Sequence, residues 1–115
     1  MTGYHTYQNC VDACLKCAAI CNHCASACLQ EEDVKMMARC IQLDRYCAGI
    51  CRLAATFMAR ADGFGGEQYA RQLCGLCAQI CEDCGNECAR HEAEHCQRCA
   101  EACKRCAEEC RNMAA

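Results

Sequence analysis

Three segments of the chain share one cysteine pattern, C-x-x-C-A-x-x-C-x-x-C-x-x-x-C, at residues 14–28, 74–88 and 96–110. In the last of them, CQRCAEACKRCAEEC, the residues between the thiols are Ala, Glu, Gln, Lys and Arg, which are strong helix formers. Steps of three and four residues average 3.5, the spacing of inward positions in a helical bundle. The repeat therefore predicts helices that each turn a stripe of thiols toward a shared core.

The length of 115 residues suits a single domain, which we expect to span residues 1–115. We predict helices at about residues 5–29, 33–61, 67–90 and 94–113, with Asp33 as an N-cap and DGFGG (62–66) as the clearest break. Short connections make sequential helices antiparallel. The predicted fold is an all-α, up-down-up-down four-helix bundle with a cysteine-lined core.

The core of such a bundle would be unusual, because Leu, Ile, Val and Phe are scarce and cysteine is abundant, with 19 residues. Free thiols pack like small hydrophobic groups, so they can take the inward positions that Leu holds in an ordinary bundle. The chain has no proline, and most of its residues favour helix. We therefore predict that the metal-free chain folds.

The state of these thiols depends on the compartment. The first residues, MTGYHTYQNCVDACLK, lack a basic start and a continuous apolar run, so they predict no signal peptide and a cytoplasmic protein. Cytosolic cysteines stay reduced, and an odd number cannot pair completely, so metal binding is favoured over a disulfide scaffold. No run approaches the roughly 18 apolar residues of a membrane span, and a net charge of −3 gives no basic patch for nucleic acid.

Thiolates select Cu(I), Zn(II) or iron–sulfur clusters. Zn(II) on four thiolates keeps two negative charges, whereas Cu(I) ions bridged by shared thiolates approach one ion per sulfur and neutralise the core. Iron–sulfur motifs of known spacing lie in loops and are absent from the sequence. The sequence therefore predicts many Cu(I) ions per chain. The candidate ligands are Cys10, Cys14, Cys17, Cys21, Cys24, Cys28, Cys40, Cys47, Cys51, Cys74, Cys77, Cys81, Cys84, Cys88, Cys96, Cys99, Cys103, Cys106 and Cys110.

The second predicted helix differs from the others, because its thiol stripe stops halfway. The stripe reads Met37, Cys40, Asp44, Cys47, Cys51, Ala54 and Met58. Antiparallel packing places its apolar half at the end of the bundle that holds Cys10, Cys74 and Cys110, where Tyr7, Ala70 and Met113 continue the other stripes. This end is predicted to be closed by an apolar plug. The opposite end, which holds Cys28, Cys40, Cys88 and Cys96, is predicted to form a mouth.

Four further residues are candidate ligands. His91 and His95 extend the third stripe at the mouth, and the alternative for each is a solvated turn histidine. Met37 or its neighbour Met36 could pass Cu(I) inward or simply pack. Asp44 could bind an ion, but a pairing with Arg39 or Arg45, or a hydrogen bond, is favoured because a carboxylate is a hard ligand.

With these stripes, the sequence resembles the copper storage proteins from Cys10 to Cys110, and specifically their cytosolic branch. The three cysteine repeats together with Cys40, Cys47 and Cys51 carry the resemblance. It implies a homotetramer of four-helix bundles, each loaded with Cu(I) along its core, and copper uptake at one end near His and Met. A copper chaperone is a candidate partner.

Two other functions are compatible with a thiol-rich chain. A metallothionein-like zinc or cadmium buffer would bind about one ion per three or four thiols. A thiol redox buffer would cycle C-x-x-C pairs to disulfides, although such a pair needs only two cysteines near a helix N-terminus. The sequence has no Ser/His/Asp set and no phosphate loop, so we expect no enzyme activity.

Overall fold

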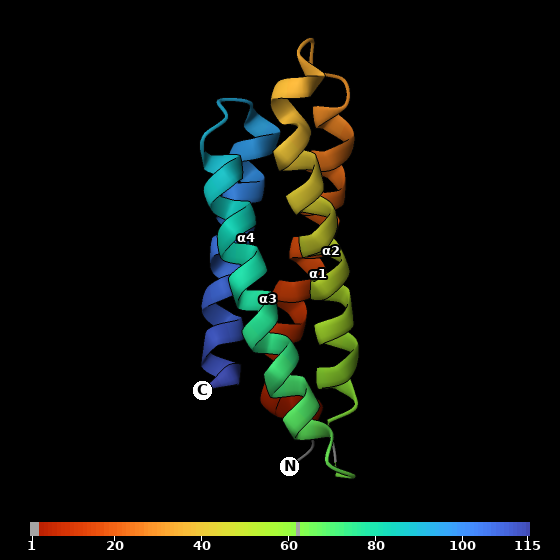
Figure 1. Ribbon diagram of the computed structural model, residues 1–115. Coiled ribbons are helices and arrows are strands. Elements are labelled where there is room, and N and C mark those ends of the chain that lie inside the picture. The colour runs from red at the N-terminus through yellow and green to blue at the C-terminus, as the bar shows by residue number, and fades with distance from the viewer. Residues whose placement is uncertain (1–2, 62) are drawn as a thin grey trace.

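The computed structural model describes residues 3–61 and 63–115, and it is an antiparallel four-helix bundle (Figure 1). The helices are α1 (Gly3–Cys28), α2 (Ala38–Ala59), α3 (Gly66–Ala89) and α4 (Glu94–Ala114), with a 3-10 turn, η1 (Val34–Met37), before α2. The described residues contain no β-strand. The predicted all-α bundle with a cysteine-lined core is confirmed.

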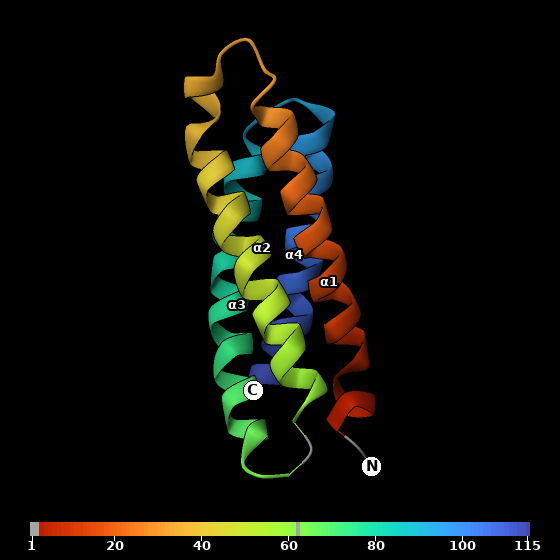
Figure 2. The same ribbon diagram turned by 90° about the vertical axis from the view of Figure 1, so that its right-hand side faces the viewer.

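The bundle is a narrow rod, with principal dimensions of 49 × 17 × 17 Å. Each helix packs against its neighbours in the chain, and α4 closes the bundle against α1 (Figure 2). The α1–α2 and α3–α4 connections lie at one end of the bundle, and the start of α1, the end of α2, the start of α3 and the end of α4 lie at the other (Figures 1 and 2). None of the helices in the described part of the chain is both long and apolar enough to span a bilayer.

The connections have local causes in the sequence. The Asp33 side chain accepts a hydrogen bond from the Met36 backbone N–H at 3.3 Å, which starts η1 rather than an uninterrupted helix from residue 33. At the other end, Gly63, Phe64 and Gly65 all have positive φ (74°, 53° and 78°), so the chain reverses within a few residues. Asp62, the first residue of that segment, lies outside the described residues.

The core follows the cysteine stripes. All nineteen cysteines are buried, and the remaining core is mostly Ala, with Met58 as the largest fully buried side chain. Large apolar residues lie on the flanks of the stripes, where Leu43, Leu73 and Ile80 are only partly buried. The thiols therefore occupy the positions that would hold large aliphatic groups in an ordinary bundle.

Candidate metal centre

The thiols form a continuous buried array along the bundle axis. Cys10 is 1% exposed, the other eighteen cysteines have no exposed surface, and all nineteen are free. They come from all four helices, because each stripe turns one face inward at helical spacing. All of the cysteines predicted as ligands are therefore gathered in one place.

Sulfur atoms lie close together both along a helix and between helices. The i, i+4 pair Cys17–Cys21 has a sulfur–sulfur distance of 3.8 Å. Between α2 and α3, the Cys40–Cys88 pair lies at 3.3 Å. Cys17 also lies 3.8 Å from Cys47 on α2 and from Cys103 on α4. One thiol thus has sulfur neighbours on its own helix and on others, an arrangement in which a thiolate can bridge two metal ions.

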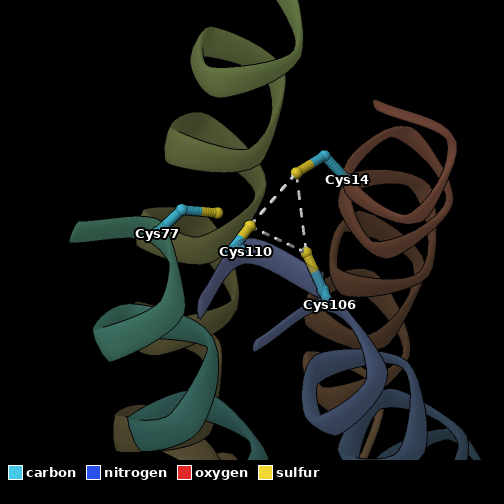
Figure 3. Close-up of side chains that lie close together, drawn as sticks. All are labelled: Cys14, Cys77, Cys106 and Cys110. Carbon is cyan, nitrogen blue, oxygen red and sulfur yellow. Dashed lines mark hydrogen bonds between the residues drawn. The ribbon is translucent and has the colours of Figure 1, made fainter. Parts of the chain in front are cut away.

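Groups of four ligand atoms within 4.8 Å of one another recur along the array. Cys14, Cys77, Cys106 and Cys110 form one such group, with sulfur atoms from α1, α3 and α4 pointing toward a common space (Figure 3). In this group the Cys14–Cys106 and Cys14–Cys110 distances are both 3.6 Å. The array therefore supplies a series of thiol groups whose spacing suits a soft metal ion.

Asp44 is the one carboxylate of the thiol stripes, and it is fully buried. Its Oδ1 accepts hydrogen bonds from the thiols of Cys99 at 3.1 Å, Cys84 at 3.2 Å and Cys88 at 3.6 Å. Cys84 and Cys88 lie toward the mouth on α3, whereas Cys99 contacts thiols deeper in α4. Asp44 thus joins the thiols near the mouth to those of the deeper array.

The surroundings of Asp44 favour its neutral form. Burial, followed by the proximity of Cys99 and Cys84, raises the pKa of Asp44 to about 10. Burial likewise raises the pKa of Cys96 to about 11, with a further contribution from Cys40. At neutral pH Asp44 and Cys96 are therefore protonated in the metal-free protein, and neither adds a buried charge.

His95 reaches the thiols at the mouth. Its Nδ1 lies 3.5 Å from the sulfur of Cys96, 3.6 Å from that of Cys24 and 3.8 Å from that of Cys28. Its Nε2 lies 2.9 Å from Oε2 of Glu31, in the connection after α1. A proton on Nε2 donated to this carboxylate leaves the Nδ1 lone pair directed at the sulfurs.

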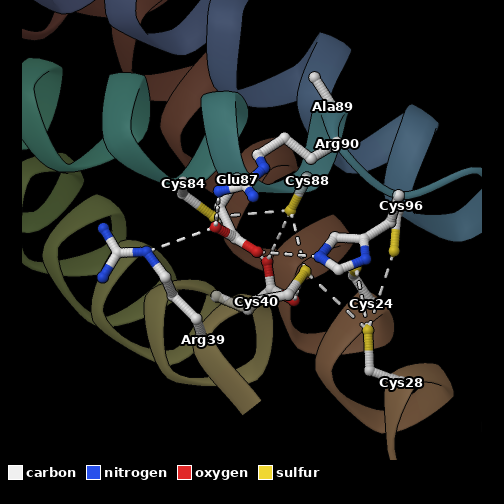
Figure 4. Close-up of polar contacts among 12 residues, drawn as sticks. Cys24, Cys28, Arg39, Cys40, Cys84, Glu87, Cys88, Ala89, Arg90 and Cys96 are labelled. Atoms are coloured by element: carbon white, nitrogen blue, oxygen red, sulfur yellow. Dashed lines mark hydrogen bonds and ion pairs between the residues drawn. The ribbon is translucent and has the colours of Figure 1, made fainter. Parts of the chain in front are cut away.

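His91 has a similar carboxylate partner on its own helix. Its Nε2 lies 2.9 Å from Oε2 of Glu87, which is almost fully buried. Arg39 and Arg90 both extend toward the Glu87 carboxylate, at 3.3 and 3.6 Å (Figure 4). Glu87 therefore ties the start of α2 to the end of α3 beside the mouth.

The remaining residues considered in the sequence differ in burial and in their contacts. Met37 is buried at the mouth end of α2, whereas Met36 is exposed. Arg39 pairs with Glu87, whereas Asp44 accepts hydrogen bonds from thiols. A role for Asp44 as a metal ligand stays a prediction. At the opposite end the apolar plug contains Tyr7, Ala54, Met58 and Ala70, all buried, and Met113, partly buried.

Two carboxylates of the mouth were not among the predicted site residues. Glu87 stands four residues before His91, so helical spacing contained the signal for their contact. Glu31 is 64 residues from His95 in sequence, and nothing in the sequence links the two. Both carboxylates bind Nε2 of a histidine, which is the position of an orienting partner around a metal site.

Comparison with known proteins supports a metal-storing role. The family model for the copper storage protein matches residues 4–115. A Cu(I)-bound copper storage protein, BsCsp3, is 47% identical with a TM-score of 0.83, over 94% of this chain and 97% of that one. A cytosolic copper storage protein from Streptomyces lividans, with five coppers, is 38% identical with a TM-score of 0.91, over 97% of this chain and 94% of that one. The cysteine-rich protein YhjQ of Bacillus subtilis is 48% identical over 71 residues, which are 62% of this chain and span 61% of that protein.

Proposed function

Because the chain belongs to the copper storage protein family, we propose that it stores many Cu(I) ions on its buried thiols. The observation that carries this proposal is the array of nineteen free, buried cysteines with sulfur atoms as close as 3.3 Å across helices. Such an array suits buffering, detoxification and later supply of copper. The family resemblance favours copper storage over a zinc or cadmium buffer and over a thiol redox buffer.

Cu(I) suits this core for reasons of charge and coordination. The ion carries one positive charge, so equal numbers of Cu(I) ions and thiolates sum to zero in a core without exposed surface. Soft thiolates prefer Cu(I), and it accepts two or three of them, which neighbouring i, i+4 and cross-helix thiols supply. The thiols are too many and too alike to act as a single nucleophile, and we infer storage without catalysis.

We infer that the cysteines are the ligands and that the mouth residues assist them. His95 supports this inference through its Nδ1, which faces three sulfurs. Asp44 supports it through its contacts with three thiols on α3 and α4. His91 and Met37 lie at the same end of the bundle, and we propose that they act during uptake rather than in the deeper array.

The direct test is an anaerobic titration of the reduced protein with Cu(I), with copper and protein both measured after gel filtration. We expect a plateau near one copper per cysteine, roughly nineteen ions per chain, because only this ratio neutralises the core. A triple Cys→Ala variant at positions 10, 74 and 110 should bind about three ions fewer while its far-ultraviolet circular dichroism stays helical. A wild-type plateau of four or five ions would show separate four-thiolate sites and would contradict the proposal.

The compartment and the delivery partner follow from the same role. The S. lividans relative is a cytosolic protein, and we propose the same compartment here. Reducing conditions there would keep the thiols free for copper. We also propose that a copper chaperone presents Cu(I) at the mouth, where the exposed Met36 and the partly exposed His95 are the accessible soft donors.

We propose that the bundles associate with one another, as a homotetramer, through the outer face of α2 and α3. Four large side chains on this face are exposed, namely Tyr46, Leu53, Tyr69 and Leu76. The rings of Phe57 and Tyr69 meet edge-on at a centroid distance of 6.5 Å, so the apolar surface continues from α2 to α3. An apolar face of this kind on a charged, water-soluble rod is typical of an interface.

Lysine at this face should break the assembly. We expect the double variant Leu53→Lys/Leu76→Lys to run as a single bundle in size-exclusion chromatography with light scattering, because four lysines around a twofold contact would repel and lose apolar contact. Leu29→Lys is the matched control, since Leu29 is equally exposed but lies in the mouth connection. A double variant with the mass of the wild type would place the interface elsewhere.

A further inference from the structure

Four donor atoms lie close together at the mouth. They are the sulfurs of Cys24, Cys28 and Cys96 and Nδ1 of His95. The sulfur–sulfur distances are 3.9 Å for Cys24–Cys28 and 3.9 Å for Cys28–Cys96, and the three nitrogen–sulfur distances range from 3.5 to 3.8 Å. The sulfurs of Cys24 and Cys96 lie within 4.8 Å of each other.

The five distances of 3.5–3.9 Å are close to the edges of a tetrahedral zinc site. Bonds of about 2.3 Å from Zn(II) to sulfur and about 2.0–2.1 Å to nitrogen give edges of about 3.8 Å between sulfurs and about 3.5 Å between sulfur and nitrogen. A Cys3His donor set is also an established zinc ligand combination. The donors of the mouth are therefore positioned for a four-coordinate divalent ion before any ion binds.

Glu31 completes the arrangement as an orienting partner. Its Oε2 accepts the Nε2 proton of His95 at 2.9 Å, which holds the imidazole as the tautomer with a free Nδ1. Glu31 itself is 40% exposed in its side chain, so its charge stays hydrated. A carboxylate bound to the far nitrogen of a ligating histidine is the usual partner in zinc sites.

Charge separates the mouth from the deeper array. One group of four cysteines in the deeper array also has nearly tetrahedral spacing. Its sulfur–sulfur contacts are 3.7–3.8 Å, and its members are Cys17, Cys21, Cys47 and Cys103. A divalent ion there would leave two negative charges in a set without exposed surface. At the mouth, a divalent ion bound by three thiolates and a neutral imidazole would leave only one negative charge. This charge would lie beside the His95 side chain, which is 15% exposed.

We propose that Cys24, Cys28, Cys96 and His95 form a binding site for one Zn(II)-like divalent ion in the copper-free protein, with Glu31 as the residue that orients His95. Binding of the divalent ion at this site does not depend on the proposed copper storage function. Its displacement by arriving Cu(I), which thiolates bind more tightly, rests on the proposed function. A divalent ion would thus occupy the mouth until copper arrives.

The test is an anaerobic titration of the full-length, reduced, copper-free protein with Co(II), followed by Zn(II) to displace it. We expect one Co(II) per chain with the intense visible bands of a four-coordinate thiolate site, and their loss when Zn(II) is added. Glu31→Gln should weaken Co(II) binding about 10–100-fold, because the orienting carboxylate is lost. Glu32→Gln, an exposed carboxylate one residue away, and His23→Ala, an exposed histidine beside Cys24, should bind like the wild type.

Several results would overturn the proposal. They are the absence of tight Co(II) binding, the binding of several Co(II) ions with equal affinity, or equal affinities for Glu31→Gln and Glu32→Gln. Circular dichroism of each variant checks that it is folded. Cu(I) titration of the same preparations separates the two proposals: a copper capacity near one per cysteine without a Co(II) site contradicts only this inference, whereas a low copper plateau contradicts the storage function.

Discussion

Asp44→Asn should remove most of the pH dependence of stability of the copper-free protein between pH 5 and pH 8. In the wild type, Asp44 is surrounded by thiols and has no exposed surface. Asn has nearly the same shape and still presents an acceptor oxygen to Cys84 and Cys99, but it cannot ionise. The variant therefore changes the charge chemistry of the site with little change in packing.

The direction in which the stability of the wild type changes with pH follows from proton linkage. The pKa of Asp44 is about 10 in the folded protein and about 3.9 in an unfolded chain, so between these values the folded state holds a proton that the unfolded state has lost. The stability that this proton provides is complete below about pH 4 and is lost as pH rises toward 10. The free energy of unfolding of the wild type should fall by about 1.4 kcal/mol per pH unit in this window, roughly 4 kcal/mol from pH 5 to pH 8.

Denaturant unfolding under anaerobic, reducing conditions at pH 5, 6, 7 and 8 measures this slope. The window suits Asp44 because thiols in the unfolded chain, with a pKa near 8.5, stay mostly protonated below pH 8. Asp12→Asn is the matched control, since Asp12 is exposed on α1 and its replacement should leave the slope unchanged. If Asp44→Asn retains the wild-type slope, Asp44 is ionised in the folded protein and the thiols around it stabilise its charge.

Copper loading should release about one proton for each Cu(I) bound, or roughly nineteen protons per chain at pH 7. A core of nineteen thiols without exposed surface disfavours many buried thiolates, so we expect the thiols to be protonated before loading. Burial is the leading cause of the raised pKa of Cys28 and Cys96. Cu(I) binds the thiolate, so each ion that enters replaces a proton and the net charge of the core stays near zero. The apparent affinity for each ion should consequently rise up to about tenfold per pH unit.

A pH-stat titration of the reduced protein in weak buffer measures the protons released per copper. A ratio close to one from the first ion to the last supports neutral loading of the whole array. A ratio near zero would mean that the array already holds thiolates balanced by cations, which contradicts the charge argument for Cu(I). A competition titration at pH 6, 7 and 8 checks the predicted change in affinity independently.

The fold was predictable because one residue type, cysteine, marks most inward positions of the helices. Any helix with cysteines at steps of three and four turns them to one face, and four such faces can be buried only against one another. The stripe of α2 also predicted which end of the bundle is closed by apolar residues, since Ala54 and Met58 continue it and both are fully buried. Both predictions depend only on the number of residues between successive inward positions, which can be read directly from the sequence.

Contacts between stripes were harder to predict, because they depend on axial register. Asp44 could be placed on the inward face of α2, but the sequence could not identify Cys84 and Cys99 as its neighbours. The pairing of Glu31 with His95 depends on how a short connection folds over the mouth, and helical periodicity says nothing about it. Similarly, Asp33 was expected to begin a helix, yet the cap opens a 3-10 turn and α2 starts at Ala38.

The apolar plug at one end of the bundle has a consequence for the order in which ions move. Met58, Ala54 and Ala70 have no exposed surface, so we expect ions to exchange with solution through the end that holds His95. Ions that pass from thiol to thiol in a narrow tube cannot overtake one another. We therefore expect last-in, first-out exchange, in which a copper isotope loaded late is released before one loaded early.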